Sequence, residues 1–322
     1  MTTPGAPPTS DPQQYVAHLV ADVASGLAHP PSAAAVQRLV DRVEQASVPG
    51  RGSGASSAVR LAVGLLAEDL LRRDPGPARV RRRDLRAPRR GVLLVGAPLA
   101  VAATRAASGL PALRPLRPTQ VVVLGRPLDE ALADAWAFQV HGGVNRTWGG
   151  MTATLAARDR IPPRSDAAWV AARWAGLVGA GRVHVVTRPG PLAGVAHEPL
   201  TVVHPPVAAA PVELARRTAE QLGILTDRAS HARIVAEVLH PLLAREQGPG
   251  PRVRDRLEPW LRRHAADIVE GVRAGGYALH GDPADLALRD EGTVRWPGSD
   301  HQQPALLAVA VRTLLALCEE SP

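Results

Sequence analysis

Short runs of Val and Leu alternate with helical patterns in the middle of the chain. Three such runs, residues 92–95, 121–124 and 183–186, have the length and apolar character of strands buried on both faces of a sheet. Apolar residues after these runs, and before the third, recur at helical spacing in segments 99–107, 128–140 and 167–177. Because strand and helix patterns alternate, we expect an α/β fold with a small parallel sheet and crossover helices.

Helical periodicity dominates both flanks of this region. It covers residues 15–73, and the last third of the chain has four more helical patterns, at 212–222, 232–243, 257–273 and 305–317. Residues 1–14 are polar and rich in proline, so we expect them to be disordered, and residues 74–90 are an Arg- and Pro-rich linker. The sequence therefore predicts a mainly helical N-terminal segment and, at 91–322, an α/β core with a helical C-terminal extension.

The basic residues of this chain are all arginine. There are 38 of them, no lysine, and a formal net charge of +8. The absence of lysine excludes Schiff-base chemistry, Walker-type lysines and lysine general bases, while arginine binds phosphate, sulfate or carboxylate through a planar fork. Abundant Ala, Arg, Gly, Pro and Val with a single asparagine, Asn145, are typical of a GC-rich genome. We favour this codon bias as the explanation of the missing lysine.

The remaining composition indicates a cytoplasmic protein. Cys318 is the only cysteine and cannot form an internal disulfide, which is typical of a reducing compartment. The first residues do not have the pattern of a signal peptide, and no apolar run approaches the length of a membrane span. The eleven histidines do not have metal-ligand spacing, so no metal is expected.

Two motifs have a structural explanation that we favour over a functional one. The loop Gly52–Ser57 precedes a helix, but phosphate loops normally follow a strand, so we interpret it as a flexible linker. The arginine cluster Arg79–Arg90 lacks the interleaved aromatic residues of single-strand nucleic-acid sites. We interpret it as a solvated linker and expect neither a nucleic-acid nor a membrane partner.

Arg126 is the strongest candidate for anion binding. It follows the strand at 121–124, and ligands of open parallel sheets bind outside the carboxyl ends of the strands. An arginine at that place can hold a phosphate or a sulfate. A surface arginine in a turn explains its position equally well, so position alone leaves both interpretations open.

Three segments resemble the bacterial sulfotransferase family in the order that the family has them: Gln120–Gln139, Asp166–Thr187 and Ala266–Leu286. The resemblance covers roughly residues 91–290. It implies a P-loop-type fold, a nucleotide donor (3′-phosphoadenosine 5′-phosphosulfate, PAPS) and a small-molecule acceptor of unknown identity. It also implies that Arg126 grips the 3′-phosphate of PAPS, because Arg126 has the place of the family's strand-end arginine.

The chain departs from the family at the donor loop. Family members carry a Pro-Lys-Thr-Gly-Thr-type loop, but the corresponding residues 21–32 here contain neither lysine nor a Gly-Thr turn. A serine that the family places after the strand-end arginine is also missing. Sulfuryl transfer depends on groups that neutralise developing charge, so these losses predict weak or absent catalysis. Any remaining nucleotide site would use Arg126 with Ser25, Gly26 and Ser32.

The resulting hypothesis is a divergent sulfotransferase-like protein that is a weak or inactive enzyme. A general base could be His18, His29 or His141, and we favour His141 because it follows the helix beside Arg126. The alternative is a non-catalytic binding or scaffold protein that engages an anionic or protein partner through Arg79–Arg90 or a helical surface. A third hypothesis is an unrelated enzyme that handles anions with arginines alone. The Ala- and Leu-rich C-terminal helices could pack internally or form a homodimer.

Overall fold

The computed structural model describes most of the chain. It covers Val20, Val23 and residues 31–46, 55–74, 76, 90–110, 115, 117–195, 200–288 and 299–319. The segment 1–14, which the sequence predicts to be disordered, lies outside these residues. So does the arginine cluster 79–90, except for Arg90, which begins the first strand.

The main sheet has four parallel strands, which confirms the expected α/β fold with a parallel sheet. Their spatial order is β1 (Arg90–Gly96), β2 (Arg117–Leu124), β3 (Val183–Val186) and β6 (Ala278–His280). In the register of the sheet, Val123 of β2 lies between Val95 of β1 and Val185 of β3. Because all strands run in one direction, their carboxyl ends meet at one edge of the sheet.

Each face of the sheet has its own core, since successive residues of a strand point to opposite sides. Val121 and Val123 pack in a core with three helices: α5 (Leu128–His141), α7 (Ala167–Val178) and α11 (Glu258–Ala274). Val122 and Leu124 pack in a second core. That core is completed by α4 (Pro98–Ala107) and by an antiparallel hairpin of β4 (Gly190–Leu192) and β5 (Leu200–Val202).

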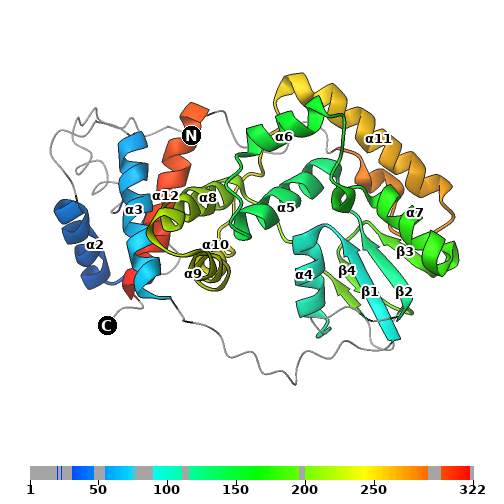
Figure 1. Cartoon of the computed structure of the whole chain (residues 1–322), viewed down its shortest axis with the longest axis horizontal. Helices are drawn as coiled ribbons and strands as arrows, with labels where there is room; N and C mark the ends of the chain where they lie inside the picture. The colour runs from blue at the N-terminus through cyan, green and yellow to red at the C-terminus, as the bar shows by residue number, and fades with distance from the viewer. Residues whose placement is uncertain are drawn as a thin grey trace.

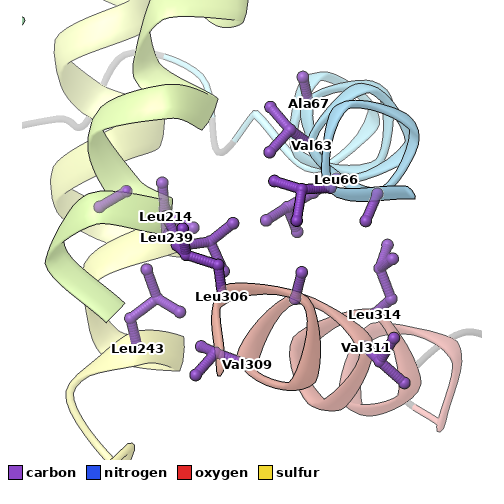
Figure 2. Packing of buried hydrophobic residues seen from close by; sticks show 14 of the residues in the cluster. Val63, Leu66, Ala67, Leu214, Leu239, Leu243, Leu306, Val309, Val311 and Leu314 are labelled. Atoms are coloured by element: carbon purple, nitrogen blue, oxygen red, sulfur yellow. The ribbon is translucent and has the colours of Figure 1, made fainter. Parts of the chain in front are cut away.

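A helical bundle lies beside the sheet and joins segments from both ends of the chain (Figure 1). Its elements are α2 (Ala33–Ala46), α3 (Ala55–Arg72), α8 (Ala209–Leu225), α9 (Arg228–Ile234), the π-helical turn η4 (Val235–Leu239), α10 (His240–Leu243) and α12 (Ser299–Glu319). Figure 2 shows how Leu66 of α3, Leu214 of α8 and Leu306 of α12 meet between their helices. The bundle core is built almost entirely from Ala, Val and Leu, as expected from a chain with 3% aromatic residues.

Helix α5 connects the two parts. Leu128 and Leu132, near its start, belong to the core of the sheet, whereas Trp136 and Val140, near its end, belong to the core of the bundle. Shorter elements complete the described fold: α6 (Trp148–Ala157), η2 (Pro163–Ser165), η3 (Ala180–Arg182), η5 (Asp255–Leu257) and η6 (Pro283–Leu286). The start of α5 lies at the carboxyl edge of the sheet, where a ligand site is expected.

Candidate functional site

Arg126 lies at the carboxyl edge of the sheet, where the sequence places it. The backbone N–H of Gly125 donates to the carbonyl of Val186 at 2.8 Å, which ties the end of β2 to β3. A Cβ atom at position 125 would lie 2.7 Å from Cδ2 of Leu286, so only glycine fits this turn without a shift of its neighbours. Pro127 then leads into α5. The side chain of Arg126 is 3% exposed.

The guanidinium of Arg126 is bound by groups of the chain itself. Its Nη2 lies 2.9 Å from Glu130 Oε2, and its Nη1 lies 3.3 Å from Asp134 Oδ2. Nη1 also donates to the carbonyl of Pro205 at 3.1 Å. Among the described residues, its Nε has no hydrogen-bond partner. Two carboxylates therefore balance the single positive charge of this arginine.

Asp134 also occupies the N-terminus of α4, a second position that attracts anions. Its Oδ1 accepts from the N–H of Leu99 at 2.8 Å, and its Oδ2 accepts from the N–H of Ala100 at 3.1 Å. These donors belong to the first turn of α4, where N–H groups lack partners within the helix. Burial raises the pKa of the fully buried Asp134 carboxyl, and the hydrogen bonds from Leu99 and Ala100 and the charge of Arg126 offset this rise only in part. An internal carboxylate thus satisfies both the arginine and the helix terminus.

A cavity of about 340 Å³ opens beside Arg126. Much of its wall is apolar or backbone from proline- and glycine-rich segments, formed by Ala133, Pro189, Pro206, Val207, Gly248, Gly250, Pro251, Val253, Leu261 and Leu288. The ionisable side chains that line it are Arg126, Asp129, Glu130, His204 and Glu258. Three carboxylates therefore face this space together with one arginine.

The carboxylates reach the cavity from two helix N-termini. Asp129 and Glu130 lie in the first turn of α5, and Glu258 is the first residue of α11. Carboxylates are stabilised at such positions by the helix dipole, which explains how the fold tolerates several of them in one place. Glu258 Oε1 also accepts from Arg262 on the same helix, at 2.6 Å from Nη2. The cavity wall is nevertheless richer in negative than in positive groups.

Of the residues expected to complete a donor loop, the described one, Ser32, does not line this cavity. Ser25 and Gly26 lie outside the described residues. Ser32 accepts from the N–H of Ala35 at 3.2 Å through its Oγ, and its own N–H donates to Glu319 at the end of α12. It therefore begins α2 within the helical bundle. The structure does not bring Ser32 together with Arg126.

His141, the favoured general base, lies at the far end of α5 from Arg126. At about 1.5 Å per residue, the length of α5 separates the two positions by about 20 Å. Its ring packs against His240 of α10 with ring centroids 3.8 Å apart. Burial and the neighbouring His240 lower the pKa of His141 to about 3. His141 and Arg126 thus cannot act on one small substrate, and His18 and His29 lie outside the described residues.

The sequence alone indicated Arg126 but not its partners. Asp134 lies eight positions after Arg126, about two helical turns along α5, where the long side chain of Arg126 reaches it. Glu258 and the loops around Pro206 and Gly250 come from distant parts of the chain, and no local motif marks them. The i,i+4 spacing of Arg126 and Glu130 was the one signal of neutralisation in the sequence.

Comparisons with family models, curated proteins and solved structures give no match to this chain. Within the described residues, no group of three or more His, Cys, Asp or Glu side chains is arranged to hold a metal ion. None of the described helices combines the length and the apolar character needed to span a membrane. The site must therefore be interpreted from its own geometry, as a cavity at the carboxyl edge of a parallel sheet with a largely acidic polar lining.

Proposed function

We propose that this protein binds a small cationic molecule in the cavity beside Arg126 and that it is a binding protein rather than a sulfotransferase. The observation that carries the proposal is the charge of the wall: Asp129, Glu130 and Glu258 line the cavity together with one arginine. Glu130 pairs with Arg126 and Glu258 with Arg262, and the group remains negative overall. The proposal corresponds to the non-catalytic alternative among our sequence hypotheses, but with a different surface as the binding site.

An anion would be repelled at this place. The guanidinium of Arg126 is balanced by Glu130 and Asp134, so a phosphate that reached it would add further negative charge to the cluster. Two like charges about 4 Å apart repel by about 4 kcal/mol at the effective dielectric constant of a partly buried site. The N-terminus of α4 offers no compensation, because Asp134 occupies it.

A compact amine with an apolar body matches the cavity. The volume of about 340 Å³ lies at the lower end of the range for small-molecule sites. Val253, Leu261 and Leu288 provide apolar surface for the body of the ligand. The carboxylates would then receive an ammonium or amidinium group through charge-assisted hydrogen bonds.

The proposal can be tested with benzylammonium as the probe and benzyl alcohol as its neutral counterpart. Calorimetry should detect benzylammonium binding, benzyl alcohol should bind at least tenfold more weakly, and Glu258→Gln should weaken benzylammonium binding by a similar factor. Glu270→Gln is the matched control, because Glu270 is an exposed carboxylate on the same helix that does not line the cavity. Equal affinity for the two probes would overturn the proposal.

Sulfuryl transfer from PAPS is the second candidate, because Arg126 does lie on a cavity at the carboxyl edge of the sheet. Titration with adenosine 3′,5′-bisphosphate distinguishes the two candidates. We expect no heat at millimolar ligand. Binding that the natural protein shows and an Arg126→Ala variant lacks would favour the nucleotide site and reject the cationic one.

A further inference from the structure

Two histidines that do not line the cavity meet on one face of the sheet. In the parallel register, His184 of β3 lies beside Ala278 of β6, and Val186 lies beside His280. His184 and His280 are therefore diagonal neighbours whose side chains point to the same side, because alternate residues of a strand share a face. Both are only partly buried, so solvent has access to the pair.

The ring nitrogens of this pair converge. Nδ1 of His184 lies 3.0 Å from Nε2 of His280. On the other side of the ring, Nε2 of His184 lies 3.1 Å from Oε1 of Gln120 on β2. The row Gln120, His184 and His280 thus crosses three neighbouring strands.

The glutamine fixes the proton of His184. Oε1 of Gln120 is an acceptor, so Nε2 of His184 carries the hydrogen and its Nδ1 presents a lone pair toward His280. In the contact as it stands, Nε2–H of His280 then donates to Nδ1 of His184. Metal binding requires the other neutral tautomer of His280, with its hydrogen on Nδ1 and a lone pair on Nε2. Burial and the neighbouring His280 lower the pKa of His184. A neutral imidazole is the form that binds metal ions.

We propose that Nδ1 of His184 and Nε2 of His280 form a chelating site for a divalent transition metal, with water or another small ligand in the remaining coordination positions. Gln120 is the positioning residue. It holds the ring of His184 through the nitrogen that does not bind the metal, which is the usual arrangement around metal-bound histidines.

The separation of the two nitrogens favours Cu²⁺ or Ni²⁺ over Zn²⁺. Nitrogens 3.0 Å apart, each bonded to a metal at about 2.0 Å, subtend an angle of about 95° at that metal. This angle fits the square-planar or tetragonal geometry of Cu²⁺ and Ni²⁺. A tetrahedral Zn²⁺ site would need the nitrogens about 3.3 Å apart, so the two rings would have to move apart by about 0.3 Å.

Calorimetric titration of the full chain with each of the three metal ions tests the site. Glycine in the buffer, as a weak competing chelator, suppresses binding to single histidines. We expect one Cu²⁺ per chain, a weaker Ni²⁺ site and still weaker Zn²⁺ binding. His184→Gln and His280→Gln should each weaken Cu²⁺ binding at least tenfold. His264→Gln is the control, since His264 lies on α11 bonded to Asp159 and should leave the affinity unchanged.

Further measurements separate a metal site from a structural histidine pair. Electron paramagnetic resonance of the Cu²⁺ form should show two coordinated imidazole nitrogens in the natural protein and fewer in His280→Gln. Gln120→Leu should weaken Cu²⁺ binding about 10- to 100-fold, and Gln120→Glu, which restores an acceptor, should recover it. Should a histidine variant fail to fold, Ni²⁺ must still raise the melting temperature of the natural protein. Absence of that rise, or equal binding by natural protein and variants, would overturn the proposal.

Discussion

Asp134 is fully buried and contacts two separate features, the guanidinium of Arg126 and the N–H groups that begin α4. Each of these features is typical of an anion site when it is open. Because one internal carboxylate fills both, the negative charge that a ligand would bring is already present in the fold. Because Asp134 supplies this negative charge, the presence of Arg126 alone does not make the cavity selective for anionic ligands.

Replacing Asp134 with Asn should destabilise the protein. The change removes one of the two carboxylates that balance Arg126 and weakens the cap of α4. Glu130 still pairs with Arg126 in this variant, so the loss comes from the buried hydrogen bonds of Asp134 and should be about 1–3 kcal/mol. Urea unfolding measures this loss. Asp159→Asn is the control, since the contacts of Asp159 with Arg263 and His264 are exposed, and it should leave the unfolding midpoint almost unchanged. Similar midpoints for the two variants would contradict this account.

His141 should make the protein less stable in mild acid. Its pKa is about 3 in the folded chain and 6.5 in the absence of burial, so between these values only the unfolded chain binds a proton there. The free energy of unfolding should fall as the pH is lowered through this window, by up to about 1.4 kcal/mol per pH unit. Unfolding curves from pH 7 to pH 4.5 should show a shallower decline in His141→Leu than in a His264→Leu control. Parallel declines would show that His141 does not titrate in this way.

The residues of the site differ in how far a sequence can predict them. Arg126 follows a recognisable strand, so its place at the sheet edge was predictable from local pattern. Its pairing with Glu130 has the i,i+4 spacing of a local contact, whereas its hydrogen bond to the carbonyl of Pro205 depends on how a distant loop packs. The contact between His141 and His240 likewise joins residues that are 99 positions apart. Nothing in the local sequence distinguishes a buried histidine pair from a catalytic one.

At the scale of elements, the strand-to-helix turn after β1 depends on one glycine. Gly96 has φ of +117°, and a Cβ there would lie 2.5 Å from the carbonyl oxygen of Leu124 in the neighbouring strand. Gly96→Ala should therefore cost about 3 kcal/mol through backbone strain and this clash. Gly64 lies within α3, and a methyl group there would meet open space, so Gly64→Ala should stabilise the protein by up to about 1 kcal/mol. Thermal melts of the two variants should move in opposite directions, and shifts of the same sign would refute the argument.

Val-rich runs predicted strands correctly, whereas segments with a weaker apolar pattern were missed or assigned different bounds. The runs at β1, β2 and β3 are Val-rich and were predicted, but β6 has only Ala278, Leu279 and His280 and becomes a strand by pairing with β3. The segment predicted as one helix at 232–243 is divided into α9, a π-helical turn and α10. Pro241 explains part of the difference, because its nitrogen cannot donate within a helix.

At the scale of the whole molecule, the cores of the sheet and of the bundle share helix α5 and a tryptophan of α6. Helix α5 contributes Leu132 to the core of the sheet and Trp136 to the core of the bundle. Trp148 of α6 packs against both cores and lies 5.7 Å from Trp136 between ring centroids. Loss of the bundle would expose one end of α5 to water, and the carboxyl edge of the sheet is built on the other end. The two parts should therefore unfold together.

Leu66→Ala tests this coupling across the molecule. Leu66 is fully buried in the bundle, and its truncation should lower the free energy of unfolding by about 2–5 kcal/mol. Residues 121–124 of β2 belong to other core clusters than Leu66. If the whole molecule unfolds cooperatively, their amide hydrogen exchange should still accelerate, by the factor that corresponds to the lost free energy of unfolding. Leu177→Ala, at a position that is 67% exposed on α7, should change exchange very little. Faster exchange confined to the bundle would mean that the sheet is stable by itself. The strand end that carries Arg126 would then remain in place without the bundle, but the cavity would lose part of its wall, because Val207 packs against the bundle core.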